Sequence, residues 1–173
     1  MVTTVGTAEF IHFDANVVFE TRILRALIDG DLPNLLCIDR NSKSPGEKVK
    51  VIADDEMRVS EIGKSVDPAT ALGESIGIEK ISAVTGPLLF AELREMMENS
   101  ANAQACYEEA YARLVDKGMP FHALDITGMK WTEIDTPEDF AAANAMFGTP
   151  ITTVSRGQQR ALDEAGTKPQ ARL

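Results

Sequence analysis

The sequence has little of what marks zinc-binding, membrane-spanning or nucleic-acid-binding proteins. It contains two cysteines, Cys37 and Cys106, in 173 residues, and they form no Cys-x-x-Cys pair of the kind that binds zinc. No apolar run approaches the roughly 18 residues needed to span a bilayer. Lys and Arg number 17 against 27 Asp and Glu, and no basic cluster suited to nucleic-acid phosphates occurs. We therefore expect no zinc site, no membrane span and no nucleic-acid partner.

Two further absences bear on the location of the protein and on its chemistry. Residues Met1–Phe10 contain neither the basic start nor the apolar stretch of a signal peptide. Cys37 and Cys106 lie far apart in apolar surroundings, which favours two buried free thiols, with a disulfide as the alternative. These features predict a cytoplasmic protein. Neither common type of glycine-rich phosphate loop occurs.

The patterns that are present predict one α/β domain. The chain is 44% hydrophobic and 25% charged, which is ordinary for a globular protein. Alternating and helical apolar periods follow one another along residues 1–148 and predict a mixed sheet flanked by helices. Residues 149–173 are polar, and we expect a mobile tail there.

The expected elements follow from apolar period, turn residues and helix caps. The expected strands are 9–14, whose apolar run continues through 17–19, then 35–39, 48–51, 57–62, 77–84, 121–126 and 129–134. The expected helices are 20–29, one opened by Pro87 with an apolar stripe of Leu89, Leu93, Met96 and Met97, 103–117, and one capped by Thr136 that ends at Phe147.

Four polar residues at the ends of expected strands are candidates for chemistry. Asp14 and Asn16 follow the first strand, and Asp135 ends the last strand before a helix. Such a carboxylate binds a metal or, alternatively, caps the next turn or helix. Lys64 follows the second hairpin strand, where it is either a point charge for a phosphate or a solvated lysine. Ligands of such sheets bind at strand ends.

The two histidines have no serine or cysteine motif nearby. His12 and His122 both lie in expected strands beside aromatic residues. We assign both side chains to packing of the core.

Three segments, taken in order, resemble the nucleotidyltransferase superfamily, which includes cytidylyltransferases of phosphocholine or inositol phosphate and nucleotidyltransferases of sugar phosphates. Trp131–Asp139 is similar to the family segment W-x-E-I-D-T-x-E-D. Val49–Lys64 resembles the family's strand, acidic turn, strand and phosphate-contacting lysine. Gly73–Ile78 resembles the stretch that lines the acceptor pocket. The resemblance covers roughly Glu9–Phe147 and implies part of a nucleotide-diphospho-sugar transferase-like, Rossmann-like fold.

The resemblance also implies an activity. In this family a phosphate on the acceptor attacks the α-phosphorus of a nucleoside triphosphate, and pyrophosphate leaves. It implies CTP as the favoured triphosphate, a small phosphorylated sugar or alcohol as acceptor, and Mg²⁺ to neutralise the phosphates. The implied metal ligands are Asp135, Asp14 and Asn16. Lys64 would contact phosphate, and Glu74 would contact an acceptor hydroxyl.

The sequence departs from the family pattern in two places. The family's loop of glycine, arginine and lysine, which binds the triphosphate, has no counterpart in the sequence. The first metal position falls on Asn16, a poorer Mg²⁺ ligand than a carboxylate, while Asp14 lies about 6.6 Å away along a strand. The alternative expectation is therefore a catalytically degenerate or partner-dependent homologue that binds a sugar phosphate or another chain. Exposed strand edges would favour a homo-oligomer or a partner chain.

Overall fold

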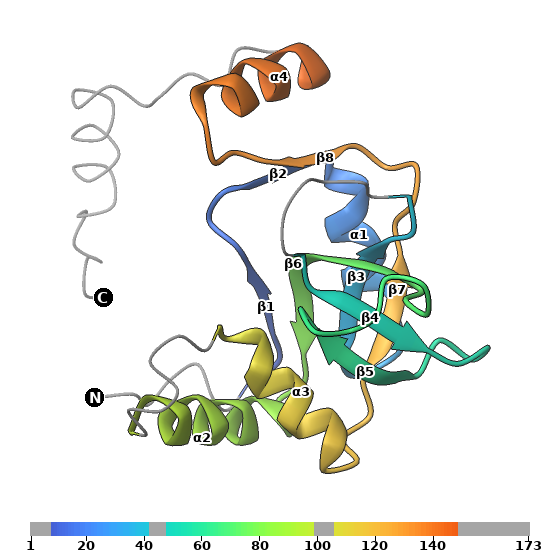
Figure 1. Ribbon diagram of the computed structural model, residues 1–173, viewed down its shortest axis with the longest axis vertical. Helices are drawn as coiled ribbons and strands as arrows, with labels where there is room; N and C mark the ends of the chain where they lie inside the picture. The colour runs from blue at the N-terminus through green and yellow to red at the C-terminus, as the bar shows by residue number, and fades with distance from the viewer. Residues whose placement is uncertain (1–7, 42–47, 99–105, 149–173) are drawn as a thin grey trace, which may run out of the picture.

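The computed structural model describes residues 8–41, 48–98 and 106–148, and Figure 1 labels the elements in them. The strands are β1 (Phe10–Phe13), β2 (Val17–Phe19), β3 (Leu35–Asp39), β4 (Lys50–Ala53), β5 (Val59–Gly63), β6 (Gly73–Ile81), β7 (His122–Asp125) and β8 (Trp131–Glu133). The helices are α1 (Thr21–Asp29), α2 (Thr85–Glu98), α3 (Glu108–Asp116) and α4 (Pro137–Phe147). The tail expected at 149–173 lies outside the described residues.

Strand β6 is the centre of a six-stranded mixed sheet. It pairs antiparallel with β1, β3 and β4, and the main order is β5-β4-β6-β3-β7. The pairing of β3 with β7 is parallel. This arrangement confirms the predicted α/β mixed sheet. The predicted strand at 77–84 was placed too late, because the extended run begins at Gly73 and helix α2 already starts at Thr85.

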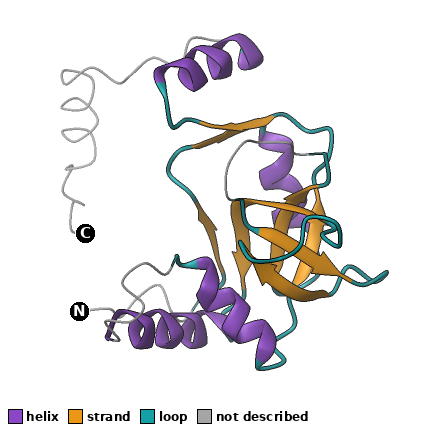
Figure 2. Ribbon diagram, in the orientation of Figure 1, coloured by secondary structure: helices purple, strands orange, loops and turns teal. Residues whose placement is uncertain are grey.

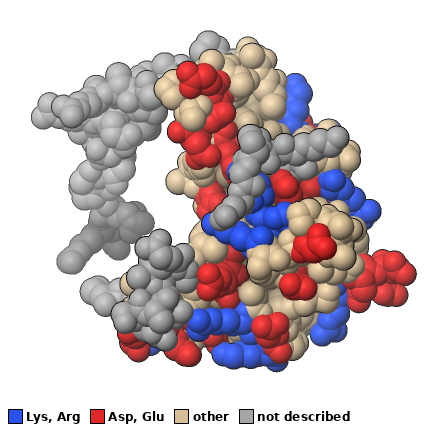
Figure 3. All heavy atoms as spheres, viewed as in Figure 1, with Lys and Arg blue, Asp and Glu red and all other residues tan. Residues whose placement is uncertain are grey.

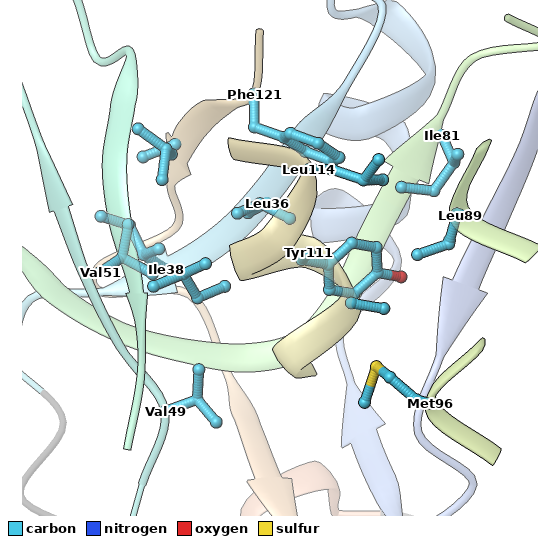
Figure 4. Close-up of a cluster of buried hydrophobic side chains, with 14 residues drawn as sticks. Leu36, Ile38, Val49, Val51, Ile81, Leu89, Met96, Tyr111, Leu114 and Phe121 are labelled. Atoms are coloured by element: carbon cyan, nitrogen blue, oxygen red, sulfur yellow. The ribbon is translucent and has the colours of Figure 1, made fainter. Parts of the chain in front are cut away.

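Helices cover both faces of this sheet, with α2 and α3 on one face and α1 on the other (Figure 2). Successive strand residues point to opposite faces, so Leu36 and Ile38 of β3 pack toward α3, while Leu35 and Cys37 pack toward α1. Figure 4 shows the first of these cores, where Tyr111 and Leu114 of α3 meet the strands. Burial on both faces explains why β3 is an unbroken apolar run.

The helices follow their predicted apolar stripes except at Met97 and at Ile28, which is 60% exposed. Ile23 and Leu27, one turn apart on α1, are fully buried, and the helix ends before Gly30 as predicted. On α2, Met96 is buried but Met97 is 86% exposed, so its assignment to the stripe was wrong. Adjacent helical residues point about 100° apart, and only one of the two can face the core. None of the helices in the described residues is long and apolar enough to cross a bilayer.

A second, two-stranded sheet, β2-β8, carries the start of the motif that begins at Trp131. Strand β2 pairs antiparallel with β8; residues 17–19 therefore do not extend the first strand, as their apolar run suggested, but start a new sheet. Helix α4 follows with the predicted cap. The Thr136 hydroxyl accepts from the Asp139 backbone N–H, and the Asp139 carboxylate accepts from that of Thr136. The Thr136 hydroxyl also hydrogen-bonds the Asp139 carboxylate at 2.8 Å, and this bond, followed by those from the backbone N–H groups of Asp135 and Thr136, lowers the pKa of Asp139 below its usual value.

A buried ion pair lies beneath the second half of β1. The Nδ1 atom of His12 is 2.8 Å from Oε2 of Glu79, which is 1% exposed. The Tyr111 hydroxyl lies 3.3 Å from the same nitrogen. The Glu79 carboxylate raises the pKa of His12, and burial raises the pKa of Glu79. The assignment of His12 to packing alone was therefore wrong.

We predict that Gly77→Ala destabilises the protein more than Gly118→Ala. Both glycines have left-handed φ angles, 69° and 84°, which cost a side-chain-bearing residue about 1–3 kcal/mol. A Cβ at Gly77 would also overlap the Asp14 carboxylate, whereas a Cβ at Gly118 has open space. Urea unfolding of both variants measures the difference. Equal losses of stability would contradict the proposed close packing of Asp14 on Gly77.

We predict that the free energy of unfolding falls as pH rises above about 6.5 and through the raised pKa of His12. The folded-state pKa values of His12 and Glu79 are both raised, so the folded chain binds more protons than the unfolded chain in this window. The stabilisation from His12 is complete below about pH 6.5 and is lost as pH passes its raised pKa. In Glu79→Gln the fall should shrink, while in the control His122→Gln it should persist. An unchanged slope in Glu79→Gln, measured by urea unfolding, would refute the assignment.

Candidate functional site

A small pocket opens where β1 ends, beside β4, the middle of β6, β8 and the start of α3. Its volume is about 160 Å³. It is lined by Asp14, Lys48, Val49, Lys64, Ser75, Gly77, Glu108 and Glu133. The lining is mostly charged, and Figure 3 shows acidic and basic side chains next to one another on the described part of the face that it draws. The pocket therefore suits a small, charged ligand better than an apolar one.

Asp14 owes its place in the pocket to Gly77. The backbone N–H of Asp14 donates to the Gly77 carbonyl at 2.9 Å, which extends the pairing of β1 with β6. The side chain of Asp14 lies directly over Gly77, in the space that a Cβ would fill. Near this point β6 shifts register against β3, between the partners of Leu36 and Ile38. This irregularity, a β-bulge, tilts the strand locally, as bulges beside functional sites often do.

Asn16 and Asp135 are joined at the other end of the site. The Ile134 N–H donates to the Asn16 carbonyl at 2.8 Å, and the Asn16 amide Nδ2 donates to Asp135 Oδ1 at 2.8 Å. Asp135 is exposed and precedes the Thr136 cap of α4. It does not line the pocket, although Glu133, two residues earlier, does. The structure thus brings Asn16 to Asp135 and places Asp14 with Lys64 in the neighbouring pocket.

The two lysines of the pocket differ in their partners. Lys48 forms an ion pair with Glu133, and both side chains are about one-fifth exposed (21% and 22%). Lys64 follows β5 and is exposed; among the described residues it forms no ion pair, and its carbonyl accepts a hydrogen bond from Lys50. The ammonium group of Lys64 is therefore the positive charge in the pocket that remains available to an anionic ligand.

Glu74 lies on the opposite face of β6 from the pocket. It is paired with Asp39 and Lys50 in the sheet register. It alternates in phase with Ile76 and Ile78, which pack against α1, and not with Ser75. Its Oε2 atom is buried without a hydrogen-bond partner among the described residues. The hydroxyl contact predicted for Glu74 stays a prediction.

Sequence reasoning missed three charged residues of the pocket, which are Lys48, Glu108 and Glu133, whereas Ser75 lies in the Gly73–Ile78 segment that was expected to line it. Glu133 could have been found from the sequence, because it precedes Asp135 by two positions in the motif that begins at Trp131. Lys48 looked like an ordinary strand residue, and Glu108 like one of two acids in a helical first turn. No local signal sets Glu108 apart from Glu109.

The carboxylates of the site suit Mg²⁺ that is shared with a substrate. No group of three His, Cys, Asp or Glu side chains able to hold a metal ion occurs within residues 8–41, 48–98 and 106–148. Mg²⁺ usually keeps several waters and binds one or two protein carboxylates together with substrate phosphates. Asp14 in the pocket wall and the exposed Asp135 provide such oxygen donors. They fit this open type of site and not an enclosed protein cage.

Comparison of the sequence with known families and proteins gives no match. No family model matches the chain, and no curated protein sequence matches it.

Comparison of the structure with solved structures does give matches. The inositol-1-phosphate CTP transferase from T. maritima matches with a TM-score of 0.60 and 19% identity, over 81% of this chain and 55% of that chain. A putative glucose-1-phosphate thymidylyltransferase from Bacillus anthracis, in complex with a sucrose, matches with a TM-score of 0.62 and 13% identity, over 90% and 60%. The CMP:2-keto-3-deoxy-manno-octonic acid synthetase complexed with CTP matches with a TM-score of 0.52 and 15% identity, over 78% and 63%.

These matches concern the fold, since all three identities are below 20%. The chain spans about 55–63% of the length of the proteins that it matches. The chain therefore has an α/β mixed-sheet fold that resembles the fold of nucleotide-diphospho-sugar transferases.

Proposed function

We propose that this protein transfers a nucleotidyl group from a nucleoside triphosphate, with CTP favoured, to a small phosphorylated sugar or alcohol. The proposal rests on one pocket. Asp14 and Lys64 both line this pocket, as does Glu133 of β8, the strand that leads to Asp135. Three structures of similar fold are a CTP transferase of inositol 1-phosphate, a putative thymidylyltransferase of glucose 1-phosphate and a synthetase complexed with CTP. They support this choice of reaction class.

In the proposed reaction an oxygen of the acceptor phosphate forms a bond to the α-phosphorus, and the bond from that phosphorus to pyrophosphate breaks. Both reactants are anionic, so the main task of the protein is to offset negative charge and to position the phosphates. The Lys64 ammonium would hold the acceptor phosphate as a point charge. Asp14 and Asp135 would hold Mg²⁺, which supplies neutralisation of the phosphates. Asn16, through its hydrogen bond, orients the Asp135 carboxylate.

The charge of the pocket makes a cation necessary. Lys48 offsets Glu133 within an ion pair, which leaves Lys64 opposed by Asp14 and Glu108. A phosphate that enters would meet more negative than positive charge. We therefore expect phosphate ligands to bind in the presence of Mg²⁺ and to lose affinity when EDTA removes it.

A second candidate function is binding of a sugar phosphate without transfer, alone or with a partner chain. The volume of about 160 Å³ is below the roughly 300 Å³ at which ligand pockets commonly begin. It suits an acceptor head group better than a whole nucleoside triphosphate. Among the described residues, Lys64 is the one unpaired cation in the pocket wall. Both observations favour the acceptor over the triphosphate.

The first prediction of the proposed transfer is pyrophosphate release. With Mg²⁺, the folded chain should release pyrophosphate from one nucleoside triphosphate and one phosphorylated sugar or alcohol out of panels of each, and EDTA should stop the release. A coupled pyrophosphate assay measures this and names both substrates. If no combination of the two panels releases pyrophosphate, transfer by this chain is rejected. Calorimetry with the same acceptors would then test the second candidate function, binding of a sugar phosphate without transfer.

The second prediction concerns the two aspartates. Asp14→Asn and Asp135→Asn should each lower kcat by about 100-fold or more, the usual loss when one preorganised electrostatic contact is removed. The control Asp55→Asn changes an exposed acid in the β4–β5 turn that is not part of the pocket lining, and it should leave kcat unchanged. Full turnover in Asp135→Asn, under the same Mg²⁺ concentration, would exclude its proposed role.

A further inference from the structure

The carboxylate of Glu108 is an unusual part of the pocket wall. Glu108 begins α3, and its Oε2 atom is buried without a hydrogen-bond partner among the described residues. Burial of a polar atom without a partner is costly, and such groups in folded proteins call for an explanation. Other buried, unpartnered side-chain atoms belong to Glu74, Glu92, Tyr107 and His122. Within the described chain, Glu108 alone combines this feature with a place in the pocket.

The electrostatic effect of the helix start does not account for this burial. An acid in the first turn of a helix is stabilised by the helix dipole, and α3 has two, Glu108 and Glu109. Glu109 gains the same stabilisation from the helix dipole while it is exposed to water. Burial and, after it, a hydrogen bond to the half-buried Glu108 side chain raise the pKa of the Cys106 thiol, and Lys64 acts on the same thiol in the opposite sense. Glu108 and Lys64 both line the pocket.

We propose that Glu108 selects a phosphorylated polyol as the acceptor, by accepting a hydrogen bond from a hydroxyl group of a ligand whose phosphate lies at Lys64. A carboxylate oxygen accepts hydrogen bonds, so the partner that Oε2 of Glu108 lacks must be a donor. A hydroxyl group provides that donor and adds no charge to the pocket. Ser75, whose side chain lines the same pocket, gives a second hydroxyl-compatible contact. The inference rests on the phosphate site of the proposed function and names its substrate class.

The position of Glu108 also explains how the pocket would separate phosphates of equal charge. A ligand without hydroxyl groups would fill the site at Lys64 but leave the Glu108 oxygen buried and unpaired. A site built to hydrogen-bond a hydroxyl rejects analogues that lack it for this reason. The discrimination would therefore lie in α3, on the opposite side of β6 from Glu74.

Calorimetric titration of the full chain with Mg²⁺ tests the inference without requiring turnover. The two probes are inositol 1-phosphate, a cyclic polyol phosphate, and ethyl phosphate, which has no hydroxyl group. We expect the wild type to bind the polyol phosphate about tenfold or more tightly, the effect of a hydrogen bond to a charged group. In Glu108→Ala this ratio should fall close to one, while ethyl phosphate still binds. In the matched control Glu109→Ala, one residue along the same helical turn, the ratio should stay at its wild-type value.

Three other outcomes would refute the proposal in whole or in part. If Glu108→Ala keeps the wild-type ratio, the role of Glu108 is refuted, while the phosphate site of the proposed function stands. If the wild type binds both probes equally, selection of a polyol is refuted and the phosphate site again stands. If the wild type binds neither probe with Mg²⁺, the proposed function and this inference both fail. Retained binding of ethyl phosphate by Glu108→Ala shows that this variant is folded.

Discussion

The contact between the Asp14 carboxylate and the backbone of Gly77 organises the site. It requires a residue without a Cβ on β6, a left-handed backbone at that residue and a hydrogen bond from the Asp14 N–H to the Gly77 carbonyl. Any side chain at this position would push the carboxylate out of the pocket. The position of the acid is therefore set by rigid strands, which hold functional groups more accurately than loops do.

A polar pair between β1 and β6 lies beneath this contact. His12, two residues before Asp14, shares a buried hydrogen bond with Glu79, and the ring of Tyr107 packs against its imidazole edge to face. On either side of this pair the sheet is covered by apolar residues of α1, α2 and α3. An ion pair that replaces apolar packing adds little stability by itself, but loss of one partner leaves an uncompensated charge. The pair thus ties β1 to β6 near the site.

Much of the fold could be predicted because its signals are local. The apolar run of β3, the alternation of the β4–β5 hairpin and the Thr136 cap with Pro137 each depend on residues within a few positions of one another. Errors arose where a local pattern was ambiguous. Met97 has the hydrophobicity of Met96 but points away from the core. Residues 17–19 have a strand pattern, but only the pairing with β8 shows which sheet they join.

What the sequence by itself determined is the set of elements, the mixed α/β character and the acids and lysine that follow the strands. Only the tertiary structure decided which of these side chains meet. Asn16 and Asp135 are 119 positions apart, and Lys48 and Glu133 are 85 apart. Glu108 enters the pocket from a helix whose own pattern does not distinguish it from Glu109. Periodicity reports on neighbours within one or two turns of chain, whereas contacts at these separations depend on how the strands are ordered in the sheet.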